Sequence, residues 1–211
     1  MAHKPDTLLL VIDVQNDFIT GGSLAVDDSK VIIPIINRVA RQFTHVALTQ
    51  DWHPAGHASF ASSHPGMKNF DTKMMSYGPQ TLWPDHCVQD THGAAFHADL
   101  DIPHAQMVVR KGYQPLIDSY SAFFAADRVT ATGLADYLRD RGVHRLVFAG
   151  LATDFCVAWS ALDARKLGFE VLVLEDACRG INLNGSVDAA WHDMIAAGVT
   201  RTTSSAIGVA E

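Results

Sequence analysis

The sequence predicts an α/β protein in which a parallel sheet is covered by helices on both faces. Two observations support this fold class. Short runs of consecutive apolar residues recur along the chain, as in strands that are buried on both faces. Segments with helical periodicity separate these runs, as the crossover connections of a parallel sheet require. With 211 residues, the chain is long enough for a full core, and we expect a single domain over residues 1–211.

The first half of the chain supplies three of the expected strands and one helix. The first strand is expected at 8–12, where five consecutive residues read Leu-Leu-Leu-Val-Ile, and shorter apolar runs predict strands at 46–49 and 107–109. A helix is expected at about 29–43, because apolar residues return there every three or four positions. These positions are Val31, Ile32, Ile35, Ile36, Val39 and Phe43.

The second half alternates helix and strand more closely. The expected elements are helices at 134–138, about 154–166 and about 187–197, and strands at 146–149, 171–174 and 200–203. A glycine follows each of these helices and ends it (Gly142, Gly168 and Gly198). Open parallel sheets bind ligands just beyond the carboxyl ends of their strands, so the functional residues should follow the strands.

Residues 52–105 interrupt this alternation. The segment has little periodicity, is frequent in Gly and Pro, and carries seven of the eleven histidines (His53, His57, His64, His86, His92, His97 and His104). Such a long irregular stretch inside a compact α/β domain is uncommon and usually functional. We therefore expect an insertion at about 52–105 that binds metal and substrate, with most of its histidines at the surface.

Composition and charge exclude several classes of protein. A formal net charge of −7 provides no basic surface for nucleic acid or acidic membranes. No apolar run approaches the roughly 20 residues of a membrane-spanning helix, and the first residues do not resemble a signal peptide. Three cysteines are too few for a disulfide framework, and no chemical role is predicted for Cys178. We expect a cytoplasmic protein that acts on a small molecule, and a homo-oligomer is compatible with the sequence.

Three reactive side chains follow predicted strands. Asp13 ends the first strand, Lys111 follows the third, and Cys156 lies in the first turn of the helix after the fourth. The carboxyl ends of parallel strands share one edge, so these side chains should lie close together. The helix start and Lys111 would favour a Cys156 thiolate, and Asp13 would accept its proton. The alternatives are a packed cysteine, a surface lysine and a capping aspartate, with Asp17 a weaker candidate for the acid.

A metal site is indicated beside this edge. Asp51 and His53 follow the second strand, and residues two apart in an extended segment point the same way. His86 is the expected third ligand, because a proline-containing loop holds it. Two imidazoles and one carboxylate leave coordination positions open, as in a catalytic site, and zinc, iron or manganese would fit. His57 and Ser59 are close enough in sequence to assist, directly or through water.

Motifs spread over the whole chain carry a family resemblance. Leu-Val-Ile-Asp-Val-Gln-Asn-Asp-Phe at 10–18 and Asp-Ala-Cys-Arg-Gly at 176–180 mark a superfamily. Asp-Trp-His at 51–53 and Trp-Pro-Asp-His-Cys at 83–87 are more specific. With the matching stretches at 110–112, 118–123 and 150–157, the chain resembles the nicotinamidases of the isochorismatase-like cysteine hydrolases.

The resemblance implies a fold, an activity and a metal. It implies a Rossmann-like parallel sheet of six strands and hydrolysis of nicotinamide to nicotinate and ammonia, with pyrazinamide as a second substrate. The implied triad is Asp13, Lys111 and Cys156, acting through a Cys156 thioester. The implied metal is one divalent ion, most often zinc, held by Asp51, His53 and His86, with Ser59 or water in the fourth position.

The resemblance also implies features around the nucleophile. A non-proline cis peptide is expected at 151–152 or 152–153, and the backbone N–H groups of Ala152 and Cys156 are expected to hold the oxyanion. The expected ring-binding residues are Phe18, Leu24, Trp83, Tyr120 and Ala152. The alternatives are another amidohydrolase of the superfamily and a non-catalytic metal- or ligand-binding protein on this fold. Stoichiometric bound metal would argue against an isochorismatase, and alkylation of Cys156 at neutral pH would argue against a binder.

Overall fold

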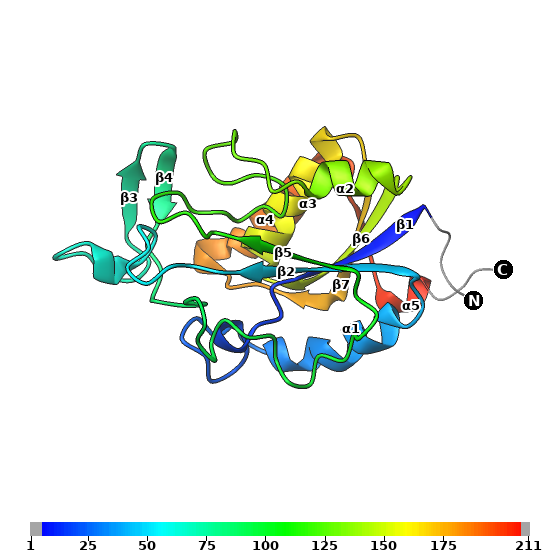
Figure 1. Ribbon diagram of the computed structural model, residues 1–211, viewed down its shortest axis with the longest axis horizontal. Coiled ribbons are helices and arrows are strands. Elements are labelled where there is room, and N and C mark those ends of the chain that lie inside the picture. Colours follow the sequence, from blue (N-terminus) through cyan, green and yellow to red (C-terminus); the bar gives the residue numbers. More distant parts are fainter. Residues whose placement is uncertain (1–5, 208–211) are drawn as a thin grey trace.

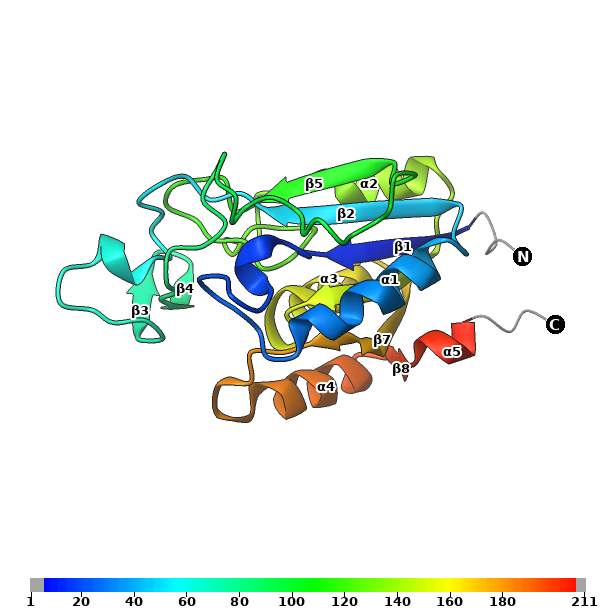
Figure 2. The same ribbon diagram turned by 90° about the horizontal axis from the view of Figure 1, so that it is seen from below.

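A six-stranded sheet forms the centre of the computed structural model, which describes residues 6–207 (Figures 1 and 2). The strand order is β5-β2-β1-β6-β7-β8, and all neighbouring pairs are parallel. This confirms the predicted sheet. Its strands are β1 (Thr7–Ile12), β2 (His45–Asp51), β5 (Met107–Lys111), β6 (Arg145–Leu151), β7 (Glu170–Arg179) and β8 (Thr200–Thr202).

Helices cover both faces of this sheet, as predicted (Figure 1). One face carries α1 (Ile32–Ala40) and α5 (Ser204–Ile207), and the other carries α2 (Leu134–Asp140), α3 (Ala158–Lys166) and α4 (Ser186–Ala196). Alternate residues of β1 enter the two apolar cores on opposite faces, which is why the strand is apolar throughout. Within residues 6–207, no helix is long and apolar enough to cross a membrane.

Three predicted elements differ from the structure at their ends. Strand β7 runs to Arg179 although the apolar run stops at Leu174, because its backbone still pairs with β6 through Gly150 and Cys178. The helix expected at about 29–43 begins with a 3₁₀ turn, Ser29–Val31, and α1 ends earlier than expected. The helix expected at about 154–166 begins with a π-helical turn, Thr153–Val157, which precedes α3.

The insertion at 52–105 is mostly irregular, as expected, but it contains a hairpin that the sequence did not predict. Strands β3 (Thr72–Met75) and β4 (Gly78–Thr81) pair antiparallel and project away from the main sheet (Figures 1 and 2). A short 3₁₀ turn, Ala61–Ser63, precedes the hairpin. Figure 2 shows the insertion at the carboxyl-end edge of the sheet, where the predicted functional residues lie.

Candidate active site

Three of the predicted side chains meet beyond the carboxyl ends of β1, β5 and β6. The Nζ atom of Lys111 lies 2.8 Å from Asp13 Oδ2 and 3.3 Å from Cys156 Sγ. A carboxylate oxygen of Asp13 lies within 4.8 Å of the Cys156 sulfur, and all three residues are buried. This arrangement can move a proton between sulfur and carboxylate beside a fixed cation.

The backbone explains why these groups converge. Asp13 has a left-handed φ of 47°, which turns the chain out of β1, and the Thr49 hydroxyl donates to Asp13 Oδ1 at 2.6 Å. Lys111 is the last residue of β5 and pairs in register with Asp51 of β2. Cys156 lies in the π-helical turn that follows the cis peptide Leu151–Ala152, one of the two expected positions for that bond.

Burial and the close charges together set the pKa values of this cluster. Burial raises the pKa of Cys156 well above the ordinary thiol value, and the opposing charge of Lys111 does not offset it. Desolvation of the sulfur therefore opposes the lowering of the thiol pKa that was expected from the helix start and Lys111, and a base is needed to remove the thiol proton. Burial also raises the pKa of Asp13 against the lowering effect of Lys111. For Lys111 itself, burial acts to lower the pKa, but Asp13 and Asp51 raise it well above its usual range.

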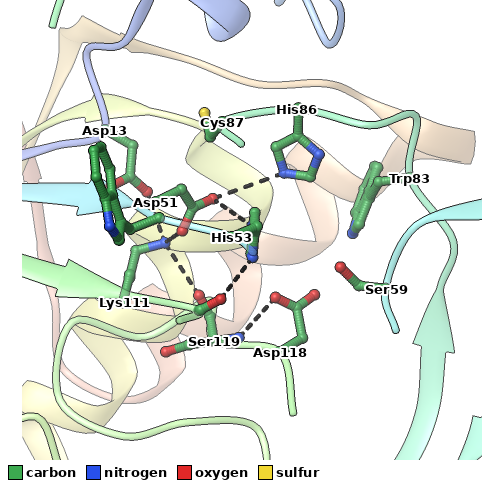
Figure 3. A network of polar contacts seen from close by, with 12 residues as sticks. Asp13, Asp51, His53, Ser59, Trp83, His86, Cys87, Lys111, Asp118 and Ser119 are labelled. Carbon is green, nitrogen blue, oxygen red and sulfur yellow. Dashed lines mark hydrogen bonds and ion pairs between the residues drawn. The ribbon is translucent and has the colours of Figure 1, made fainter. Parts of the chain in front are cut away.

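The predicted metal-binding side chains form a second cluster that adjoins the first (Figure 3). Asp51 Oδ2 lies 3.6 Å from His53 Nε2 and 3.8 Å from His86 Nε2. Each imidazole is hydrogen-bonded through Nδ1 to a backbone carbonyl, His53 to Gly112 at 2.9 Å and His86 to Pro84 at 2.8 Å. An Nδ1–H donated to a carbonyl leaves the Nε2 lone pair free toward Asp51. This donor set fits a divalent metal ion.

Asp51 joins the two clusters. Its Oδ1 atom is hydrogen-bonded to the Lys111 ammonium, whereas its Oδ2 atom faces the two imidazoles. Burial acts to raise the pKa of Asp51, but Lys111 and His53 hold it well below its usual range. Burial lowers the pKa of His86 to about 4, which favours the neutral form that binds metal. For His53, burial acts to lower the pKa, but Asp51 raises it above the ordinary value.

The Ser59 hydroxyl is engaged away from the metal-type cluster. Ser59 Oγ is 2.7 Å from His57 Nδ1, which also accepts the Ser59 backbone N–H, and His57 Nε2 is 2.8 Å from the carbonyl oxygen of Gln114. The His57 ring is therefore neutral with its proton on Nε2, and burial lowers its pKa accordingly. In Figure 3, Ser59 lies beyond His53, away from the Asp51 carboxylate. This geometry favours water over Ser59 as a fourth ligand.

A cavity connects the two clusters. Cys156, Asp51 and His86 line it, and so do all five residues expected to bind the substrate ring: Phe18, Leu24, Trp83, Tyr120 and Ala152. The Trp83 indole N–H donates to the Tyr120 hydroxyl at 2.9 Å, so the two rings hold each other at a right angle. The cavity is thus walled by aromatic side chains between a thiol and a metal-type cluster.

Comparison with known proteins places the chain in a family. The isochorismatase domain model matches residues 7–206. The chain belongs to the isochorismatase family. A nicotinamidase of Acinetobacter baylyi is 53% identical over 204 residues, which cover 97% of this chain and 95% of the relative.

Two solved isochorismatase-family structures are similar to the chain over nearly its whole length. A nicotinamidase and pyrazinamidase of Acinetobacter baumannii is 55% identical with a TM-score of 0.96 and covers 97% of this chain and 99% of its own. A pyrazinamidase of Pyrococcus horikoshii in complex with zinc is 36% identical with a TM-score of 0.78 and covers 94% of this chain and 99% of its own. The six-stranded parallel sheet is the fold of this family.

Three cavity residues of this isochorismatase-family site were not predicted from the sequence: Asp118, Phe155 and Ile181. Phe155 directly precedes the expected nucleophile Cys156, so the sequence could have predicted that it lies at the cavity. Asp118 accepts hydrogen bonds from the Ser119 N–H at 2.7 Å and from Gln80 Nε2 at 2.8 Å. Gln80 belongs to the hairpin that the sequence did not predict, so its contact with Asp118 could not be predicted either.

Two aspartates near the site hold backbone segments in place. Asp154 accepts the N–H groups of Ile181 and Asn182 at 2.9 and 2.8 Å and so fixes the loop that brings Ile181 to the cavity. Asp17, the weaker candidate for the acid, accepts the Cys87 N–H at 2.7 Å. It therefore supports the segment that carries His86.

Proposed function

We propose that the chain is a nicotinamidase that hydrolyses nicotinamide to nicotinate and ammonia. The observation that carries this proposal is the contact of one buried ammonium, Lys111, with Asp13, Asp51 and Cys156 at the end of an aromatic-walled cavity. The names of the similar proteins support the same activity, and the second name of the Acinetobacter baumannii structure supports pyrazinamide as an additional substrate.

The first half of the reaction forms a thioester. The raised pKa keeps the Cys156 thiol protonated before substrate binds, so a base must take its proton as sulfur attacks the carboxamide carbon. Asp13 takes this proton, and Lys111 stabilises the sulfur anion. The oxygen of the opened carbonyl is held by the N–H groups of Ala152 and Cys156, a contact that contributes roughly 3–4 kcal/mol per donor. When the carbonyl re-forms, the C–N bond breaks and Asp13 returns the proton to the leaving ammonia.

The second half consumes the thioester. Asp13, again a carboxylate, takes a proton from a water molecule while the water oxygen attacks the thioester carbon. The C–S bond then breaks, sulfur recovers the proton from Asp13, and the acid leaves as nicotinate after losing the second water proton to solvent. The same two side chains therefore act in both halves, with Lys111 as a fixed charge that neither gains nor loses a proton.

Asp51, His53 and His86 would hold one divalent ion, and water rather than Ser59 would complete its coordination. Zinc is the proposed ion, because the donor set suits it and a similar pyrazinamidase structure contains it. When bound, the ion would provide a Lewis acid for the pyridine nitrogen and so orient the ring. Phe18, Leu24, Trp83 and Tyr120 would pack against the ring faces and edges. The single domain and the cytoplasmic location remain predictions.

An ammonia-release assay tests this proposal. Purified protein should release ammonia from nicotinamide and from pyrazinamide, and prolonged chelation should lower kcat/KM for both, with recovery when zinc is restored. An isochorismatase-type enzyme would fail on both amides and would bind no stoichiometric metal. Stoichiometric metal without any amide hydrolysis would instead favour a metal-binding protein on this fold and would reject the proposed activity.

A further inference from the structure

We propose that Gln15 is a positioning residue for the metal site, because its side-chain amide substitutes for a missing strand and fixes the backbone of Asp51. The inference rests on the proposed metal site but not on the proposed substrate. Gln15 is fully buried and contacts neither the reactive sulfur nor the imidazoles through any hydrogen bond given by the described residues.

The end of β2 lacks a strand partner on one side. The register between β1 and β2 ends at Val11 and Leu48, and the left-handed φ of Asp13 then turns the chain away from the sheet. Strand β2 continues for three more residues to Asp51. Its backbone pairs with β5 on the other side, where the Trp52 N–H donates to the Lys111 carbonyl at 2.9 Å. The N–H and carbonyl of Asp51 face the side that β1 has left.

The Gln15 amide fills this position with two hydrogen bonds. Its Oε1 atom accepts the Asp51 N–H at 2.8 Å, and its Nε2 atom donates to the Asp51 carbonyl at 2.8 Å. The second Nε2 proton is donated to the carbonyl of Ala94 at 2.9 Å. Because the acceptor meets an N–H and both donors meet carbonyl oxygens, only one orientation of the amide satisfies all three partners.

Asp51 takes part in both clusters. One of its oxygens is bonded to Lys111 and the other faces His53 and His86. A shift of the Asp51 backbone would therefore move one carboxylate oxygen away from the imidazoles and the other away from the Lys111 ammonium. Groups that orient metal ligands in this indirect way typically contribute about 10- to 100-fold to metal affinity.

Gln50 provides a matched control. It is also a buried glutamine, its Nε2 atom also donates to the Ala94 carbonyl at 2.9 Å, and its Oε1 atom accepts from Arg110 Nε at 3.1 Å. Its side chain makes no hydrogen bond to Asp51 among the contacts of residues 6–207. Replacing either glutamine removes a hydrogen bond to the Ala94 carbonyl, but only replacement of Gln15 removes the two hydrogen bonds to the Asp51 backbone.

The test compares Gln15→Met with Gln50→Met, because methionine keeps the length of the side chain without its amide. Zinc dissociation constants are measured on the metal-free proteins by competition with a chromogenic chelator, and thermal unfolding of the metal-free proteins is recorded beside them. We expect zinc affinity to fall about 10- to 100-fold for Gln15→Met, with a change below about threefold for Gln50→Met. The two metal-free variants should lose similar thermal stability.

The inference would be overturned if Gln15→Met bound zinc as tightly as the wild type, or if the two variants lost the same amount of zinc affinity. A wild-type protein that binds no divalent metal would also overturn it. If Gln15→Met does not fold, Gln15→Glu replaces it, since glutamate keeps the acceptor for the Asp51 N–H but lacks the amide donors; unchanged zinc affinity in that variant would have the same meaning. Normal zinc binding in the wild type without ammonia release would reject the proposed function alone.

Discussion

The two clusters at the edge of the sheet are built differently. Asp13 and Lys111 stand at strand ends and Cys156 in the turn after β6, so the sheet register sets the distances within the proposed triad. In the proposed metal site, only Asp51 belongs to a strand, and the two histidines lie in the irregular insertion.

The two clusters are therefore stabilised by different interactions. The positions of the triad residues are fixed by the many backbone hydrogen bonds between parallel strands. In the metal-type cluster, the two imidazole rings are oriented by hydrogen bonds to the carbonyl groups of Gly112 and Pro84, and the bond from the Cys87 N–H to Asp17 holds the segment that carries His86. We therefore expect substitutions in the insertion to affect metal binding and KM, and substitutions at strand ends to affect kcat, with Asp51 as the residue that affects both.

Among substitutions that leave the proposed nucleophile in place, the largest effect is expected for Asp13→Asn. An amide cannot take the Cys156 proton, so kcat for ammonia release should fall by about 10²- to 10⁴-fold. Zinc affinity should change much less than kcat, because Asp13 does not face the imidazoles and is linked to Asp51 only through the Lys111 ammonium. Steady-state kinetics and chelator competition on the same preparation measure both quantities. A loss of zinc equal to the loss of turnover would show that the two clusters cannot be separated.

Asp51→Ala is expected to disrupt both clusters together. The variant removes a metal ligand and leaves the buried Lys111 ammonium with one carboxylate fewer, a change of a kind that costs about 3–5 kcal/mol. Bound zinc should become undetectable after dialysis, and kcat/KM should fall by at least about 10²-fold. Metal analysis and ammonia release test this. Retained stoichiometric zinc would refute the assignment of Asp51 as a ligand.

His86→Ala should affect the metal side alone. Zinc affinity should fall by at least about tenfold and KM should rise, whereas the rate of Cys156 alkylation should match that of the wild type, because His86 makes no contact with the sulfur among the described hydrogen bonds. Since the Cys156 pKa is raised, alkylation by iodoacetamide should be slow at neutral pH in both proteins and accelerate as the pH rises. Slow alkylation therefore does not separate an enzyme from a binding protein, contrary to the expectation from the sequence, and fast alkylation at neutral pH would contradict the raised pKa of the buried sulfur.

The smallest effect is expected for Asp17→Asn. The carboxylate that accepts the Cys87 N–H becomes a weaker acceptor, and a hydrogen bond of this kind contributes about 1 kcal/mol, or roughly fivefold in zinc affinity. Asp85→Asn is the control, because Asp85 adjoins His86 but bonds to Ser62 in the same insertion. Equal effects of the two substitutions on zinc affinity would show that net charge, not the hydrogen bond, determines the result.

The sheet was predictable because its physical signal is local. Five of the six strands contain a short apolar run, β8 being the exception, and parallel strands bring their carboxyl ends to one edge whatever their exact register. The convergence of Asp13, Lys111 and Cys156 follows from this rule. Strand β7 was predicted too short because Glu175 and Asp176 interrupt the apolar pattern, although backbone pairing, which the pattern does not report, continues.

The remaining features depend on partners that are distant in sequence. The hairpin β3–β4 carries no clear alternation, and its Gln80 reaches Asp118 only in the folded chain. The raised pKa of Cys156 depends on complete burial, which the position of a cysteine near a helix start does not reveal. Nothing in the sequence indicated that Asp154 would bind the loop at 181–182.

Ammonia release by Cys156→Ala, compared with Cys178→Ala, tests the central claim most directly. Both variants remove a buried thiol, but only Cys156 adjoins the Lys111 ammonium and the cavity. Turnover of nicotinamide should fall by at least about 10⁴-fold in Cys156→Ala, with full zinc content and an unchanged fold, and should stay within about threefold of the wild type in Cys178→Ala. Substantial turnover in a folded, zinc-loaded Cys156→Ala protein would contradict a reaction that proceeds through this sulfur.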